Sequence, residues 1–198
     1  MTETNIEDWA GRLYHGEQTV LRRTLETDLP MLRDWWNEPG TAVFQRATIL
    51  PRTDEDMNAM FTAWNRNETT AGFGLSIADA ADPELLLGHV GAWGLGSPAR
   101  VATLGIVVGP QFRGRGVGTD ALRTAFRILF DELGAHKIQL QVFGFNHRAI
   151  GVYRRLGMTV EGRIRDAVFH AGTFHDEVHM GILENEYRAL PPRNIPAP

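Results

Sequence analysis

The chain has 198 residues, a formal net charge of −4 and a pI near 6.0, with 43% hydrophobic and 22% charged residues. That length predicts a single domain with a sizeable core, and the slight acidity argues against a general nucleic-acid binder, which would usually be basic. Cysteine is absent, which excludes disulfides, thiolate metal sites and a cysteine nucleophile.

The first residues are polar and acidic, and they contain no apolar segment as long as that of a signal peptide. No run of residues approaches the length of a membrane span. We therefore expect a cytoplasmic protein that binds neither membranes nor nucleic acids.

The distribution of periodic patterns divides the chain into three parts. Residues 1–18 are polar with scattered aromatics, and we expect them to form an N-terminal extension. Residues 19–185 carry the helix and strand patterns of one domain, and residues 186–198 are expected to form an extended, proline-rich tail.

The first part of the domain predicts one strand and two helices. Residues 19–23 are typical of a short strand, after which Asp28 supplies an N-cap and Pro30 fits the first turn of a helix. Pro39 should end that helix. A second helix is expected over residues 53–64, because a capping threonine and three acids precede its apolar stripe.

Strands alternate with helices in the remainder of the domain. A long helix should end at Gly134, and a shorter one should run from Asn146 to Gly157. Alternating polarity and turn residues predict strands over residues 73–78, 85–93, 101–108, 137–143, 159–168 and 173–183. The order β-α-α-β-β-β-α-β-α-β-β predicts a mixed sheet with a strand–helix–strand crossover, and hence an α/β or α+β fold.

The most informative stretch is a glycine-dense loop over residues 111–118, between a strand and a helix. Backbone N–H groups and a helix dipole converge on an anion in such an arrangement, and the loop arginines add mobile positive charge. The glycines could also simply permit a tight turn. The arginines expected around the loop are Arg113, Arg115, Arg148, Arg154 and Arg155. We infer a site for a phosphate-bearing ligand.

Two nucleotide-binding alternatives fit this loop poorly. Its G-x-G-x-G spacing departs from the Rossmann fingerprint, and Gln139 and Gln141 stand where an acidic ribose ligand is expected. A Walker A loop is excluded because no Gly-Lys-Ser/Thr is present.

Three segments together resemble the GNAT N-acetyltransferase superfamily. Residues 111–116 are similar to its Q/R-x-x-G-x-G/A loop, which wraps the pyrophosphate of acetyl-CoA. Residues 146–158 resemble its N-x-x-A-x-x-x-Y-x-x-x-G-F/M segment. Residues 163–169 and 172–180 resemble the closing hairpin of the RimJ/RimL and spermidine acetyltransferase branch.

The resemblance covers roughly residues 21–183 and is weakest before Phe73. It implies the GNAT fold: a mixed, mostly antiparallel central sheet of about seven strands, splayed between strands 4 and 5 and flanked by about four helices. It also implies an enzyme that transfers acetyl from acetyl-CoA to a primary amine by direct attack in a ternary complex. The implied acceptor is a small-molecule or peptide amine, and a homodimer is compatible with the resemblance.

The resemblance also implies roles for individual residues. The strand over residues 104–108 would pair with the pantetheine amides, and a backbone N–H near Ile106 or Val107 would polarise the thioester carbonyl. Tyr153 would protonate the departing thiolate, for which a phenol with a pKa near 10 is suited, although a lone tyrosine is more often a packing residue. The residues expected to bind the donor are Ile106, Val107, Val108, Gln111, Arg113, Gly114, Arg115, Gly116, Val117, Gly118, Thr119, Asn146, Arg148 and Tyr153.

The sequence gives less information about the residues that would bind the amine acceptor. Aromatics at helical spacing usually form core, but the family places its two early helices beside the acceptor. The residues expected to contact the acceptor are Trp36, Phe44, His89 and His175. A simple amine with a pKa of about 10.4 is mostly protonated at pH 7, so a base or a water relay must accept its proton. The candidates for that base are His89, Asp166, His170, His175 and Glu177.

Several alternatives stay open at this point. Polyamines, amino acids, ribosomal-protein N-termini and amine antibiotics are all candidate acceptors. Acids on the two early helices mildly favour a cationic one. The chain could instead be a catalytically silent acyl-CoA-binding module, or could use succinyl-CoA, which would want extra cationic residues in the acceptor slot. A metal site is not expected, because His175 and His179 lie on an alternating strand pattern rather than on a zinc-binding helix.

Overall fold

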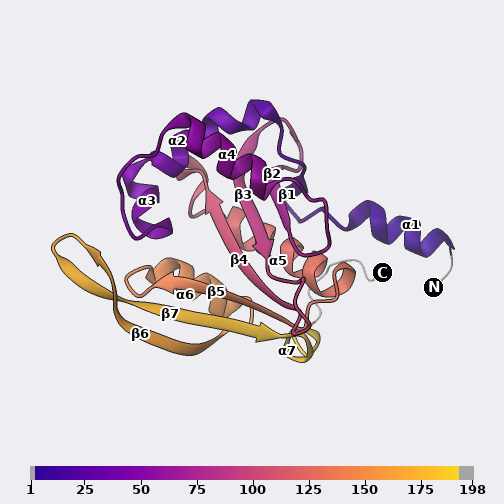
Figure 1. Ribbon diagram of the computed structural model, residues 1–198. Coiled ribbons are helices and arrows are strands. Elements are labelled where there is room, and N and C mark those ends of the chain that lie inside the picture. Colours follow the sequence, from indigo (N-terminus) through magenta and orange to yellow (C-terminus); the bar gives the residue numbers. More distant parts are fainter. Residues whose placement is uncertain (1–2, 192–198) are drawn as a thin grey trace.

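The computed structural model describes residues 3–191, which form a seven-stranded sheet in the order β1-β2-β3-β4-β5-β7-β6 (Figure 1). Within it, only β4 and β5 pair in parallel and the other neighbours are antiparallel, which confirms the mixed, mostly antiparallel sheet that the resemblance implies. The strands are β1 (Thr19–Arg22), β2 (Phe73–Asp79), β3 (Leu86–Trp93), β4 (Val101–Val108), β5 (Lys137–Phe143), β6 (Thr159–His170) and β7 (Thr173–Leu183). No helix among residues 3–191 is long and apolar enough to cross a membrane.

The four expected helices are present, and three others join them. The expected ones are α2 (Leu29–Asn37), α4 (Asp54–Trp64), α5 (Val117–Arg127) and α6 (His147–Arg155); the additional ones are α1 (Glu3–Arg12), α3 (Pro39–Gln45) and α7 (Glu184–Arg188). Pro39 lies just past the end of α2, as predicted, but it also begins α3, because proline suits the first position of a helix and the Glu38 side chain caps the Gly40 N–H.

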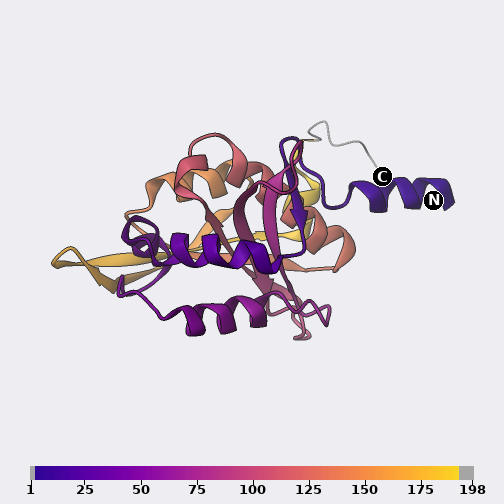
Figure 2. The ribbon, with the colours of Figure 1, turned by 90° about the horizontal axis from the view of Figure 1, so that it is seen from above.

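The helices cover the two faces of the sheet (Figure 2). On one face, α5 buries Ala121, Leu122 and Phe126 in the main core. On the other face, α2 and α4 enclose a second cluster of Leu32, Trp35, Met57, Phe61 and Leu86. The sheet therefore lies between two hydrophobic cores.

The sheet splits between β4 and β5, as the resemblance implies. Only residues 101–103 of β4 pair with residues 137–139 of β5. Residues 104–108 then continue along β3 alone, without a β5 partner. The split leaves one side of the β4 backbone unpaired in the middle of the fold.

The segment before β1 is joined to α5 by two buried side chains. Asp120, in the first turn of α5, accepts hydrogen bonds from the backbone N–H groups of Glu17, Gln18 and Thr19 and from the Thr19 hydroxyl. Arg127, in its last turn, donates to the carbonyls of residues 12, 13 and 15. Residues 12–19 therefore pack as part of the domain, although the sequence alone assigns 1–18 to an extension.

Replacing Asp120 with alanine should destabilise the protein by about 3 kcal/mol, because it leaves buried backbone donors without an acceptor. Urea unfolding measures the loss. Asp82→Ala is the matched control, since its exposed carboxylate accepts, within residues 3–191, a hydrogen bond from the Glu84 N–H alone. Equal losses in both variants would contradict a special role for Asp120.

Candidate active site

Two cavities meet at the unpaired part of β4. The glycine-loop cavity, of about 320 Å³, lies between β4, the loop before α5, and α6. The tryptophan cavity, of about 840 Å³, lies between α4, β3 and β4 and is lined by Trp36, Trp64 and Trp93. The residues that line both are Gln45, Leu104, Gly105, Ile106, Val107 and Gln141. The two cavities therefore share a wall at this part of β4.

The backbone of β4 turns Ile106 and Val108 toward the split. The Gly109 N–H donates to the Leu87 carbonyl of β3, and alternate residues of an antiparallel strand face the same way. The backbone N–H and carbonyl of Val107 therefore point toward β3, whereas those of Ile106 and Val108 point into the gap between β4 and β5. The Gln45 side chain donates to the Ile106 carbonyl at 2.9 Å, which agrees with this assignment. Of the two expected oxyanion donors, the geometry favours the Ile106 N–H over that of Val107.

The loop before α5 turns on two left-handed glycines. Gly114 has φ +78° and Gly116, the N-cap of α5, has φ +89°. A Cβ on Gly118, which lines the cavity, would lie 3.3 Å from Val108 Cγ2. This loop places the N-terminus of α5, the positive end of its dipole, at the glycine-loop cavity. Such a position suits a phosphate group.

Three arginines line this cavity: Arg113, Arg148 and Arg155. The sequence predicts mobile arginines in this loop, but Arg113 is held in place. Its guanidinium donates to the Val108 carbonyl at 3.0 Å and to the Thr41 hydroxyl. Burial, and secondarily the nearby charge of Arg148, lowers the pKa of Arg113. The cavity therefore concentrates positive charge that a bound anion would relieve.

Asn146 and Tyr153 lie on one face of α6 and both line the glycine-loop cavity. The Asn146 side-chain oxygen accepts from the Ala149 N–H at 3.2 Å, which leaves its amide N–H groups for a ligand. Burial raises the pKa of Tyr153 to about 12. The phenol is therefore protonated at neutral pH, in the form that donates a proton.

Most of the expected donor-binding residues line the glycine-loop cavity. Those that do are Ile106, Val107, Val108, Arg113, Gly114, Gly116, Gly118, Thr119, Asn146, Arg148 and Tyr153. Gln111, Arg115 and Val117 do not line it; Gln111 is exposed and Val117 is buried in the core. Gln45 and Thr41 come from α3, a helix that the sequence alone does not predict, so nothing local to the loop indicates them.

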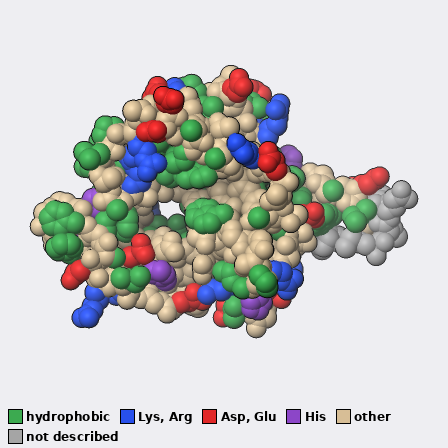
Figure 3. All heavy atoms as spheres, viewed as in Figure 1, with side chains coloured by type: hydrophobic (Ala, Val, Ile, Leu, Met, Phe, Trp, Pro, Cys, Tyr) green, Lys and Arg blue, Asp and Glu red, His purple; other side chains and the backbone are tan. Residues whose placement is uncertain are grey.

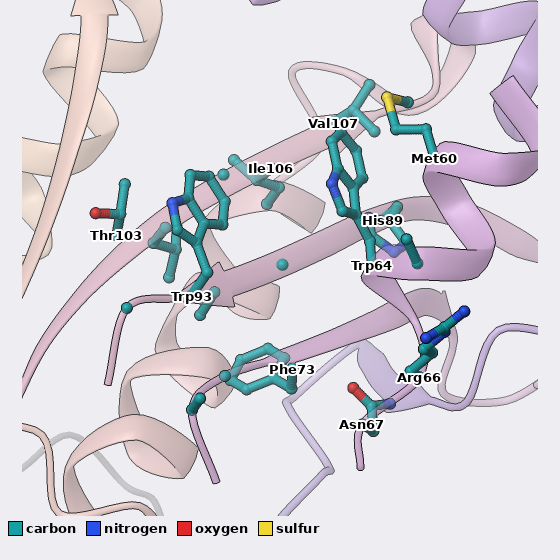
Figure 4. Close-up of a pocket in the computed structure, with 18 of the residues that line it drawn as sticks. Met60, Trp64, Arg66, Asn67, Phe73, His89, Trp93, Thr103, Ile106 and Val107 are labelled. Atoms are coloured by element: carbon teal, nitrogen blue, oxygen red, sulfur yellow. The ribbon is translucent and has the colours of Figure 1, made fainter. Parts of the chain in front are cut away.

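The four residues expected to contact the acceptor do not lie together. Trp36 and His89 line the tryptophan cavity, whereas Phe44 lines the glycine-loop cavity and contacts Phe145. His175 lines neither and hydrogen-bonds through Nε2 to the His170 carbonyl. Figure 4 shows the rings of Trp64 and Trp93 on either side of Ile106, facing the same space.

His89 is the one base candidate that lines a cavity. Its Nε2 lies 2.8 Å from Asn65 Oδ1, and the Asn65 amide nitrogen donates to the Phe61 carbonyl, so His89 is assigned an Nε2–H. Burial lowers the pKa of His89 to about 4. His89 is therefore neutral at pH 7 and is a weak proton acceptor there.

The other base candidates line neither cavity. His170 Nε2 lies 3.1 Å from the Arg46 carbonyl, and Glu177 pairs with His179. Asp166 is exposed at a register shift of β6, where its φ is +52°. No group of three or more potential metal ligands occurs among residues 3–191.

Replacing His89 with glutamine should reduce the sensitivity of the fold to acid. The folded pKa, about 4, lies below the unfolded value of 6.5, so the unfolded chain binds the proton first as the pH falls. The His89 contribution is complete above pH 6.5, and about 3 kcal/mol is lost progressively down to pH 4. Urea unfolding at pH 7 and pH 4.5 tests this, and an equal loss in both proteins would contradict it.

Comparisons with known proteins agree with the fold. Residues 18–159 match the family model "Acetyltransferase (GNAT) domain". The spermidine N(1)-acetyltransferase of Escherichia coli K12 is 33% identical over 166 residues, which cover 83% of this chain and 80% of that protein. The L-amino acid N-acetyltransferase AaaT of the same strain is 30% identical over 82 residues, covering 41% of this chain and 51% of that protein.

A solved structure shows the same fold. The spermidine N-acetyltransferase of Vibrio cholerae, crystallised with CoA and spermine, has a TM-score of 0.77 at 23% identity, covering 86% of this chain and 98% of that one. The match of the family model, the identity to the Escherichia coli enzyme and the split sheet all lead to one conclusion. The chain belongs to the GNAT acetyltransferase family.

Proposed function

We propose that the protein transfers an acetyl group from acetyl-CoA directly to a primary amine, with both reactants bound at once. The observation that carries the proposal is that two separate cavities meet at Ile106, whose backbone N–H and carbonyl point into the gap between β4 and β5. A donor in the glycine-loop cavity and an amine in the tryptophan cavity would approach each other there. Holding two reactants in this way removes much of the entropic cost of their encounter.

The residues of the glycine-loop cavity suit acetyl-CoA. The left-handed loop glycines, the α5 N-terminus and the lining arginines supply donors and positive charge for a pyrophosphate. The N–H and carbonyl groups of Ile106 and Val108, which have no β5 partner, suit the amides of a pantetheine arm. Gln45 and Arg113 occupy the two carbonyls in the free protein and would have to release them.

In the reaction, the neutral amine nitrogen attacks the thioester carbonyl carbon, so that an N–C bond forms and the C–S bond breaks. The Ile106 N–H would stabilise the oxyanion of the tetrahedral intermediate. Tyr153 would donate its proton to the departing thiolate and yield CoA. The amine loses one proton to water, since neutral His89 is a weak acceptor. This proton then restores Tyr153 through solvent.

Release of free CoA in the presence of a panel of primary amines tests the proposal. We expect release that depends on both acetyl-CoA and an amine, with formation of the acetylated amine in equal amount. The names of the relatives direct the panel toward polyamines and amino acids. Tight acetyl-CoA binding without release by any amine would favour the silent binding module instead.

A further inference from the structure

We propose that the amine acceptor carries a carboxylate and that Arg46 binds it in the tryptophan cavity. This inference rests on the proposed function and specifies its substrate. The charged residues that line the cavity are Arg46, Arg52, Arg66 and Glu68, an excess of positive charge. Such a cavity repels a polycation and attracts an amine whose charge is balanced by an anion.

The acids that could have favoured a cationic acceptor lie elsewhere. Asp28 is buried and pairs with Arg22 at 2.7 Å. Glu38 caps the start of α3 and accepts from the Thr41 hydroxyl, and Asp54 lies 3.4 Å from Arg33. None of these three lines the tryptophan cavity. Their carboxylates therefore interact with groups of the protein and not with a ligand in this cavity.

Arg46 is a buried cation without an acidic partner among residues 3–191. It is 9% exposed, and its guanidinium makes only two hydrogen bonds, to the carbonyls of Leu50 and Trp36, each at 3.2 Å. Its Nε is buried without a partner. A buried charge is costly unless it is paired, and a carboxylate is the usual partner of a guanidinium.

Arg127 offers a contrast within the same chain. It is also buried without an acid, but its guanidinium makes four hydrogen bonds to three carbonyls that hold the N-terminal segment, and it lines neither cavity. The role of Arg127 is accounted for by those bonds. Arg46 has unused N–H groups at the wall of a large cavity, and so is available to a ligand.

Arg46 is also held next to the reacting strand. Its neighbour Gln45 is bonded to the Ile106 carbonyl, and its own carbonyl lies 3.1 Å from His170 Nε2. In the free protein, these contacts hold Arg46 beside the cavity junction. Figure 3 shows a hollow between the lobe of α2 to α4 and the β6–β7 hairpin, with hydrophobic and Lys/Arg side chains at its rim. Tryptophan faces beside such a cation suit an aromatic or apolar amino acid.

The test compares two amines that differ only by a carboxylate, phenylalanine and phenethylamine, with spermidine as a third. Because charge-assisted hydrogen bonds contribute roughly 1.5–3 kcal/mol, kcat/KM should be roughly ten- to a hundredfold higher for phenylalanine than for phenethylamine. Arg46→Gln should bring this ratio close to one, and Arg46→Lys should restore part of it. Arg52→Gln, at an exposed position of the same cavity, should lower the ratio several-fold even if Arg46→Gln fails to fold.

Arg23→Gln is the matched control, because Arg23 is exposed and lines neither cavity, and it should leave the ratio unchanged. Equal or better turnover of phenethylamine or spermidine would overturn the carboxylate site and leave the acetyltransferase proposal standing. A tenfold preference for succinyl-CoA over acetyl-CoA would place the carboxylate on the acyl donor and overturn its assignment to the acceptor.

A binding measurement separates the two proposals. Tryptophan fluorescence should report phenylalanine binding to the CoA-loaded protein in preference to phenethylamine, without any turnover. Preferential binding with no CoA release by any amine would reject the enzyme and keep the carboxylate site. Equal binding of the two amines would reject the carboxylate site.

Discussion

Replacing Tyr153 with phenylalanine should lower kcat for acetyl transfer by roughly a hundred- to a thousandfold, the usual range for loss of a general acid. The change removes one oxygen from a ring whose burial raises the phenol pKa to about 12. The ring stays in the wall of the glycine-loop cavity, so the Kd for acetyl-CoA should change by less than about threefold. Steady-state kinetics and calorimetry measure the two quantities separately.

The pH profile sharpens this expectation. A group with a pKa of about 12 stays protonated through the accessible range, so no loss of activity with rising pH below about pH 10 should be attributable to Tyr153. The matched control is Tyr187→Phe, because Tyr187 stacks on Phe130 and lines neither cavity, although burial also raises its pKa. Unchanged turnover in Tyr153→Phe would remove this residue as the acid.

Replacing Gly116 with aspartate should raise the Kd for acetyl-CoA by at least a hundredfold. Gly116 has φ +89° and lines the glycine-loop cavity at the N-terminus of α5, so the variant adds strain, bulk and a negative charge where we expect the pyrophosphate. An introduced Cβ would also lie 2.7 Å from the end of the Gln18 side chain, which can move aside. Calorimetric titration with acetyl-CoA measures the effect.

Gly172→Asp is a close control for this variant. Gly172 has φ +79°, a Cβ added to it would meet nothing within 4 Å, and the residue sits in the turn between β6 and β7. The substitution imposes a similar backbone strain and the same charge away from the cavity. Wild-type affinity in Gly116→Asp, or equal weakening in both variants, would reject the loop as the pyrophosphate site.

The sequence was sufficient for features whose signals are local. Strand alternation and the capping residues Asn146 and Thr53 correctly placed the elements they bound. A π-helical turn over Ile128–Glu132 continues α5 almost to Gly134, which has φ +63°. The order of strands and helices indicated a mixed sheet with a strand–helix–strand crossover, and the parallel pair of β4 and β5 is that crossover. In these cases a few adjacent residues determine the conformation.

The remaining features depend on contacts between distant segments. The proline that ends α2 also begins α3, and only the tertiary position of α3 brings Gln45 to Ile106. Arg46 could not be identified from the sequence for the same reason, because the surroundings of its guanidinium and its contact with His170 of β6 form only in the folded chain. The low pKa of His89 likewise depends on burial beneath α4, which no local pattern encodes.

The split between β4 and β5 creates a sheet edge inside the molecule, and an edge normally invites another strand to pair with it. Here two side chains protect that edge, since Gln45 and Arg113 cap the Ile106 and Val108 carbonyls. A ligand that pairs with this edge exchanges one set of hydrogen bonds for another, so each exchange contributes little net free energy. The affinity for the donor must then come chiefly from the ionic contacts at the loop, and it should weaken steeply as the salt concentration rises.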